Sequence, residues 1–464
     1  MRKLYIVLIL IFCFSFLYIT NRNIVYAKNN NIDYDSVSKL LEKDIKENHI
    51  PGMAVIVVNS DEVIFSKTYG NCENIDTPFI IGSMSKSFTA LSIMKLVEEN
   101  KIDINKPIST YIDTSLYFKN KEDGDKIIIK QLLNQNSGIG TYQKLGNLKI
   151  TKNYVKYEYS NANYNLLGKI IESVSNESYS DYVTKNILEP LGMNHTSATL
   201  EESKKKGLIK GYQNYFGIPI AEDPNYPTDD NSWIQVPAGF ISSSASDMGK
   251  YLQMYLNQGL NIITEDSINK MFYDNIPQDD MDRDYYGMGW VYTKYYSKPV
   301  LTHSGLVENY TSKMFIIPED NIGVVVLVNM NDYLVTNNLL EDIVKPILGE
   351  EKPNVSNHLY LKNHLLLDAI YLVITTIAIY PIVTIRKWKN KNKTKKLYIV
   401  DIIRHLILPL LLILLPAFIA VPFWAIWNFV KDLALVLIVN SLIMILVGLY
   451  KISYLLKERK EFFR

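Results

Sequence analysis

The sequence has few cysteines, few histidines and no excess of charge of either sign. Its two cysteines are Cys13 and Cys72, and removal of a leader would leave only Cys72, which excludes an intramolecular disulfide. The 49 Lys and Arg residues balance 48 Asp and Glu residues, so no basic excess favours nucleic-acid binding. The 6 histidines are scattered, and there is no phosphate-binding loop and no Gly-x-Ser-x-Gly turn. We therefore expect no metal, no cofactor and no nucleic-acid partner.

The first 27 residues have the pattern of an export signal, a signal peptide over residues 1–27. Two basic residues precede an apolar run from Leu4 to Ile19, and a small-residue cleavage site follows, ending at Ala27. The apolar run is long for a cleaved signal, so an uncleaved signal anchor is the alternative. In either case the pattern predicts that residues 28–350 form an extracytoplasmic domain.

Long hydrophobic runs occur again after a linker of residues 351–364. Three runs are each long enough to cross a bilayer, namely residues 365–385, 397–424 and 433–454. A basic loop, residues 386–396, and a basic tail, residues 455–464, belong in the cytoplasm by the positive-inside rule. Three spans then leave everything before Leu365 outside, which agrees with the export signal. Four aromatic residues before the last span would form a belt at the outer surface: Phe423, Trp424, Trp427 and Phe429.

Strand patterns lie at both ends of the exported domain, and helix patterns lie between them. The expected strands are Gly52–Val58, Val63–Gly70, Gly289–Lys294, Val300–His303, Tyr310–Ile317 and Ile322–Asn329. The main expected helices are Ile32–Glu47, Tyr164–Val174, Tyr179–Leu188, Met248–Leu256 (capped by Ser244) and Val335–Leu348. This order predicts an α+β fold in which one antiparallel sheet is built from both ends, flanked by helices, with an inserted α-region.

Ser83 and Lys86 stand at the start of a helix that is apolar on more than one face, which indicates a helix central to a core. Residues three apart share a helix face, so the Lys86 amine can reach the Ser83 hydroxyl. A lysine can take the proton of a serine only if burial or other cations keep the lysine neutral. The same spacing at Ser36 and Lys39 lacks this context, because no strand precedes that helix.

Three motifs in order resemble those of the serine β-lactamase and penicillin-binding protein superfamily. They are Ser83-Met84-Ser85-Lys86, Tyr159-Ser160-Asn161 and His303-Ser304-Gly305. The chain looks similar to the branch that contains class C β-lactamases, D-stereospecific peptidases and related esterases, from about Ile32 to Leu348. The resemblance implies a β-lactamase/transpeptidase-like fold and catalysis through an acyl-enzyme.

The resemblance also implies a role for each motif residue. Ser83 would attack a carbonyl, while Lys86 and Tyr159 would share the transfer of its proton to the leaving group. Nearby cations are expected to lower the pKa of Tyr159 and so make it a better proton acceptor. Asn161 would orient Lys86 and hydrogen-bond a substrate amide.

The third motif would bind substrate. The N–H groups of Ser83 and Leu306 would form an oxyanion hole, and Gly305 belongs to the same substrate-binding stretch. His303 and Ser304 would line the edge strand along which a substrate backbone or carboxylate lies. Typical class C β-lactamases have Lys-Thr-Gly here, and a histidine is largely neutral near pH 7, which weakens the case for an efficient β-lactamase.

Three functions remain open from the sequence. The first is a membrane-anchored, penicillin-recognising serine hydrolase that acts on D-alanyl peptides or esters of cell-wall material. The second is a β-lactamase, with a β-lactam as its substrate. The third is a non-catalytic sensor or scaffold that binds wall fragments, motivated by three spans where one would suffice as a tether.

Overall fold

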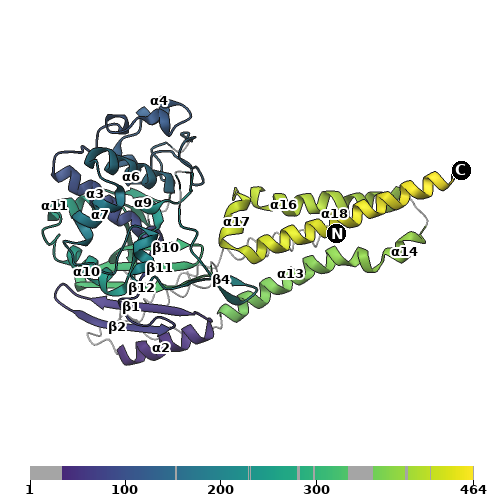
Figure 1. The fold of residues 1–464 in the computed structure, drawn as a ribbon, viewed down its shortest axis with the longest axis horizontal. Coiled ribbons are helices and arrows are strands. Elements are labelled where there is room, and N and C mark those ends of the chain that lie inside the picture. Colours follow the sequence, from purple (N-terminus) through teal and green to yellow (C-terminus); the bar gives the residue numbers. More distant parts are fainter. Residues whose placement is uncertain are drawn as a thin grey trace.

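The computed structural model describes residues 34–151, 154–227, 229, 231–279, 283–295, 298–332, 359–391, 395–418 and 420–462. These residues form a sheet domain covered by helices and a bundle of long helices that extends away from it (Figure 1). The expected signal peptide, the expected helix at residues 335–348 and most of the linker 351–364 lie outside the described residues.

An antiparallel sheet forms the centre of the first part. In spatial order its strands are β2 (Val63–Gly70), β1 (Gly52–Val58), β12 (Ile322–Val328), β11 (Tyr310–Ile317), β10 (Lys298–Val307), β9 (Val291–Tyr295), β8 (Tyr285–Tyr286) and β7 (Ile276–Pro277). β1 pairs with β12, with Met53 opposite Val328, so strands from the two ends of the domain lie side by side. The expected sheet is therefore confirmed, although β10 continues past the expected end at His303 to Val307.

The central strands are buried on both faces, and alternate residues face different cores. Val55 of β1 belongs to a cluster with the apolar side of α2 (Tyr34–Glu47), and its neighbour Ile56 belongs to a larger cluster with α3 (Ser85–Glu98). α2 lies against one side of the sheet, and the remaining helices of the domain lie against the other (Figure 1).

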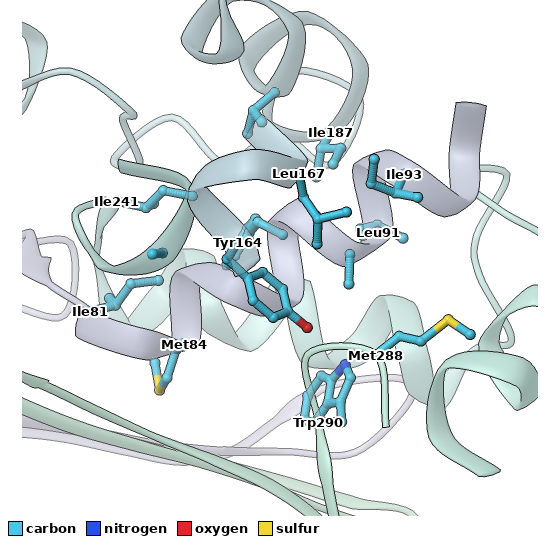
Figure 2. Packing of buried hydrophobic residues seen from close by; sticks show 14 of the residues in the cluster. Ile81, Met84, Leu91, Ile93, Tyr164, Leu167, Ile187, Ile241, Met288 and Trp290 are labelled. Carbon is cyan, nitrogen blue, oxygen red and sulfur yellow. The ribbon is translucent and has the colours of Figure 1, made fainter. Parts of the chain in front are cut away.

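The inserted α-region is built around α3, as its apolar pattern predicts. Almost all of α3 is buried, and Leu91 and Ile93 of α3 lie near Tyr164 and Leu167 of a neighbouring helix (Figure 2). The other α-helices of this region are α4 (Lys121–Asp125), α5 (Ile129–Leu133), α6 (Asn161–Ser175), α7 (Tyr179–Val183), α8 (Leu200–Lys205), α9 (Val236–Gly239), α10 (Ala245–Leu256) and α11 (Glu265–Tyr273). The expected cap of α10 is present, since Ser244 Oγ accepts from the backbone N–H of Asp247.

A hairpin outside the main sheet was not expected from the sequence. It consists of β4 (Gly211–Tyr215) and β5 (Ile218–Glu222), and β13 (Met330–Asn331) pairs parallel to β4. Both turn residues, Phe216 and Gly217, have positive φ, as a tight two-residue hairpin turn requires. Phe-Gly is an unusual pair for such a turn, so the sequence signal is weak.

Among the described residues of the C-terminal part, three helices are long and apolar enough to cross a membrane: His364–Val383, Leu397–Phe418 and Lys431–Glu458. The first lies within α13 (Leu359–Val383), and the third lies within α18 (Lys431–Phe462). The second is made of three consecutive elements, α15 (Lys395–Ile402), η6 (Ile403–Ile407) and α16 (Leu408–Phe418).

The second of these helices is shorter than the expected 397–424. The chain leaves α16 after Phe418, Ala420 has a left-handed φ of 56°, and Pro422 then precedes a separate short helix, α17 (Phe423–Phe429). The left-handed backbone at Ala420 ends this second long helix, and the extended backbone of Pro422 then precedes the first residue of α17. Trp424 therefore lies on α17 and not in the spanning helix.

Candidate active site

The fold brings the three motifs together, although they come from distant parts of the chain. Ser83 lies in a single 3₁₀ turn, η1 (Gly82–Met84), and Lys86 follows in the first turn of α3. Asn161 is the first residue of α6, which places Tyr159 just before that helix. His303 lies on β10, the strand that packs against η1.

Lys86 is fully buried and faces three oxygen atoms. Its Nζ lies 3.0 Å from Ser83 Oγ, 2.7 Å from Asn161 Oδ1 and 2.6 Å from the Ala238 carbonyl oxygen. Burial disfavours the charged ammonium and so lowers the pKa of Lys86 well below its usual value. The neutral amine has two N–H donors, which suit Asn161 and Ala238, and a lone pair that then faces the Ser83 hydroxyl. Lys86 is therefore placed and tuned to accept the Ser83 proton.

Tyr159 also lies beside Ser83. Its hydroxyl hydrogen-bonds Ser83, and Lys86 Nζ lies 4.8 Å from the centroid of its ring. Burial raises the pKa of Tyr159 above its usual value. The expectation that nearby cations lower this pKa is wrong, because the burial of Tyr159 disfavours a phenolate and is the dominant effect on its pKa. Tyr159 keeps its proton and is suited to donate it.

His303 is buried and held in one tautomer by its two neighbours. Nδ1 lies 2.8 Å from the Ser304 carbonyl oxygen, to which it must donate, and Nε2 lies 3.3 Å from the Tyr286 hydroxyl, from which it accepts. Burial lowers the pKa of His303 to about 3. The expectation of a neutral histidine in the third motif is thus confirmed, and this motif presents no cation from His303 at neutral pH.

Two glycines allow η1 and β10 to approach closely. A Cβ added at Gly82, whose φ is +54°, would lie 2.4 Å from the Leu306 backbone nitrogen. A Cβ added at Gly305 would lie 2.0 Å from the Ile81 carbonyl oxygen. Because side chains at these positions would push the two segments apart, the glycines keep the Leu306 N–H beside the turn that carries Ser83. This is the arrangement that a two-donor oxyanion hole needs.

β10 has an open edge beside the motif. Its pairing with β9 ends at Thr302 opposite Val291, whereas its pairing with β11 continues to Val307 opposite Tyr310. Within the described residues, the stretch from His303 onward therefore has a strand partner on one side only. An extended backbone can add to such an edge through main-chain hydrogen bonds.

Sequence reasoning missed two members of the site. One is the Ala238 carbonyl oxygen on α9, which is a backbone atom and leaves no signature in the side-chain pattern. The other is Tyr286, fully buried on β8, which supplies the hydroxyl to His303. In the described parts of the chain, no group of His, Cys, Asp and Glu residues could hold a metal ion.

A family model described as Beta-lactamase matches residues 37–343. The chain belongs to the β-lactamase family. Among relatives of this chain, "Protein flp" of Staphylococcus aureus (strain N315) is 29% identical over 353 residues, which cover 69% of this chain and 68% of that protein. "Beta-lactamase-like protein 4" of Dictyostelium discoideum is 27% identical over 369 residues, covering 68% of this chain and 63% of that protein.

Solved structures agree with the family assignment. The octameric penicillin-binding protein homologue from Pyrococcus abyssi has 28% sequence identity and a TM-score of 0.60, covering 69% of this chain and 79% of that chain. A D-stereospecific amidohydrolase from Streptomyces sp. has 20% identity and a TM-score of 0.53, covering 64% of this chain and 94% of that one, and shows a shared fold alone. The expected β-lactamase/transpeptidase-like fold is therefore confirmed, and with it membership of a serine hydrolase superfamily.

Proposed function

We propose that this protein is a membrane-anchored, penicillin-recognising serine hydrolase that forms an acyl-enzyme on Ser83 and acts on D-alanyl peptides or esters of the cell wall. The observation that carries the proposal is the fully buried Lys86 amine, 3.0 Å from Ser83 Oγ, whose pKa is lowered by burial. Similarity to a penicillin-binding protein homologue and three helices apolar enough to cross a membrane support it.

In the acylation step, Ser83 Oγ bonds to the substrate carbonyl carbon and its proton passes to Lys86 Nζ. The carbonyl oxygen becomes an oxyanion and receives the N–H groups of Ser83 and Leu306. The carbon–nitrogen or carbon–oxygen bond then breaks, and Tyr159 donates its hydroxyl proton to the departing atom. Lys86, now protonated, returns a proton to Tyr159.

Deacylation reverses these roles with water in place of the leaving group. The water oxygen bonds to the acyl carbon as its proton passes to the Tyr159 and Lys86 pair. The bond between that carbon and Ser83 Oγ then breaks, and the pair returns the proton to Ser83 Oγ. No separate glutamate is needed in this scheme, because the same pair acts as acid and then as base.

Substrate binding follows from the open edge of β10. An extended acyl chain would pair with the main chain beside Ser304, which is exposed, while the buried, neutral His303 adds no charge to this edge. A site that offers no cation from its third motif favours peptides and esters over substrates held mainly by a carboxylate.

The test is the intact mass of the full chain in detergent micelles, followed over time with a penicillin. A persistent adduct that is absent from Ser83→Ala supports the proposal, because slow deacylation points to natural wall substrates. Ser36→Ala is the matched control: Ser36 has the same Ser-x-x-Lys spacing but lies exposed on α2, and this variant should label like the unmodified chain.

Two outcomes contradict the proposal. A transient adduct with consumption of the free drug means a β-lactamase. No adduct, together with no Ser83-dependent hydrolysis of D-alanyl esters or peptides, means a binding module without this chemistry.

A further inference from the structure

The short helix α17 lies at the end of the bundle nearest the sheet domain (Figure 1). Two of its aromatic rings, Trp424 and Phe429, pack against Trp233 of the sheet domain, with ring centroids 5.0 Å and 6.2 Å apart. Tyr142 completes the cluster, 5.7 Å from Trp233 and 6.0 Å from Trp424. The residues expected to form a membrane belt are thus in part an internal contact.

Trp233 joins two segments that are distant in sequence. Its indole Nε1–H donates to the Thr141 carbonyl oxygen at 2.8 Å. Its own carbonyl oxygen accepts from Asn165 Nδ2 at 3.3 Å, and the N–H of Gln235 donates to Asn165 Oδ1 at 3.2 Å. A single tryptophan therefore connects α17, the segment around Thr141 and the buried side of α6.

The segment that follows Trp233 contains one acceptor group of Lys86, and the segment around Thr141 contacts the residue next to a second acceptor. The chain from Trp233 continues into α9, where the Ala238 carbonyl oxygen lies 2.6 Å from Lys86 Nζ. Beside Thr141, the Gly140 carbonyl oxygen accepts from Ser160 Oγ at 3.1 Å, and Ser160 immediately precedes Asn161, the other fixed acceptor of Lys86.

We propose that α17 is a positioning element of the active site: Trp424 and Phe429 hold Trp233, which fixes the two segments that carry the acceptors of Lys86. The C-terminal bundle then has a second purpose beyond anchoring. A single spanning helix could tether the domain, but only the connection between the second and third long helices supplies α17. The catalytic consequence rests on the function proposed above, whereas the mechanical coupling does not.

The coupling is tested by amide hydrogen exchange in the full chain in detergent micelles. Trp424→Ala should speed exchange in residues 139–145 and 233–239 by about tenfold, because the packing that holds both segments is lost. Trp427→Ala is the matched control, since Trp427 lies on the same helix and is exposed; it should exchange like the unmodified chain, as should the conservative Trp424→Phe. Unchanged exchange in Trp424→Ala overturns the proposal.

Trp233→Phe separates the two links. Phenylalanine keeps a ring for α17 but lacks the N–H that binds the Thr141 carbonyl. Exchange should therefore rise in residues 139–145 and stay low in residues 233–239. A uniform loss of protection across the sheet would instead show that the tryptophan serves general stability, which contradicts a positioning role.

The catalytic consequence is read from the rate of Ser83 acylation by a penicillin against pH. The groups that face Lys86 are Ser83 from its own turn, Tyr159, Tyr164 from α6 and His303 from β10. Trp424→Ala should slow acylation about tenfold and move its acid limb to higher pH, because water that enters beside Lys86 favours the ammonium.

Equal rates and equal acid limbs in Trp424→Ala, Trp427→Ala and the unmodified chain would overturn the catalytic part. Absence of any acylation in the unmodified chain would instead contradict the proposed function, and the exchange experiment would still decide whether α17 holds the two segments.

Discussion

The two parts of the molecule each bury a lysine, and the surroundings of the two differ. Lys86 of the sheet domain faces a hydroxyl, an amide oxygen and a backbone carbonyl, all uncharged. Lys451 of the bundle lies 2.5 Å from the carboxylate of Asp401, whose other oxygen accepts from Trp388 Nε1 at 2.7 Å. A third neighbour, His405 Nε2, lies 3.1 Å from Lys451 Nζ.

The difference shows how a buried lysine can have two different roles. A buried lysine without a carboxylate becomes a neutral amine and is able to accept a proton. A buried lysine with a carboxylate stays ion-paired, and in an apolar bundle such a pair holds helices together, because separating them would leave a charge without its partner. Asp401, Trp388 and Lys451 come from α15, α14 (Ile385–Lys389) and α18, so this contact joins the long helices near one end.

The largest effect is expected for Lys86→Arg. A guanidinium stays protonated at any working pH and cannot accept the Ser83 proton, so acylation by a penicillin should fall by about 10³-fold. The measurement is the rate of adduct formation by intact mass. Lys451→Arg is the matched control in the bundle, since it preserves the charge beside Asp401, and it should acylate normally. Acylation of Lys86→Arg within about tenfold of the unmodified rate would contradict a role for Lys86 as base.

Asp401→Asn should have the next largest effect, and on the bundle only. The substitution leaves the Lys451 charge buried beside a neutral amide. Removing one partner of a buried ion pair lowers the free energy of unfolding by about 3–5 kcal/mol. The measurement is thermal unfolding of the full chain in detergent.

The double variant Asp401→Asn with Lys451→Met should recover most of that loss, because the buried charge is gone. A double variant as unstable as Asp401→Asn alone would show that the contact matters for its shape and not for its charge.

The smallest effect concerns His303 and acid. Its pKa is about 3 in the folded chain, against 6.5 for an ordinary histidine. Between these pH values the unfolded chain binds a proton here that the folded chain does not, so the free energy of unfolding falls as pH falls, by up to about 1.4 kcal/mol per pH unit. His303→Gln should flatten this slope between pH 6 and about 4 in urea unfolding. His49 is exposed, and the control His49→Gln should leave the slope unchanged. Equal slopes in the unmodified chain, His303→Gln and His49→Gln would contradict burial of His303 in its neutral form.

Much of the sheet domain was predictable from local pattern. β1, β2 and β11 have the expected bounds, and the almost fully buried α3 follows from its apolar faces, because these features depend on residues near one another in sequence. The β4–β5 hairpin was missed because its turn, Phe216-Gly217, lacks a strong signal. The pKa of Tyr159 was expected to fall, but burial raises it. The motif does not contain the residues that bury Tyr159, so the sequence pattern could not predict this shift.

The sequence by itself determined the order of the motifs, the alternation that builds a two-sided sheet and the three long apolar helices, because spacing and hydrophobicity are properties of the chain. Only the tertiary structure decided that burial lowers the pKa of Lys86, that the Ala238 carbonyl is one of its acceptors and that α17 packs against Trp233. These depend on which distant segments exclude water from one another, and a linear pattern does not contain that information.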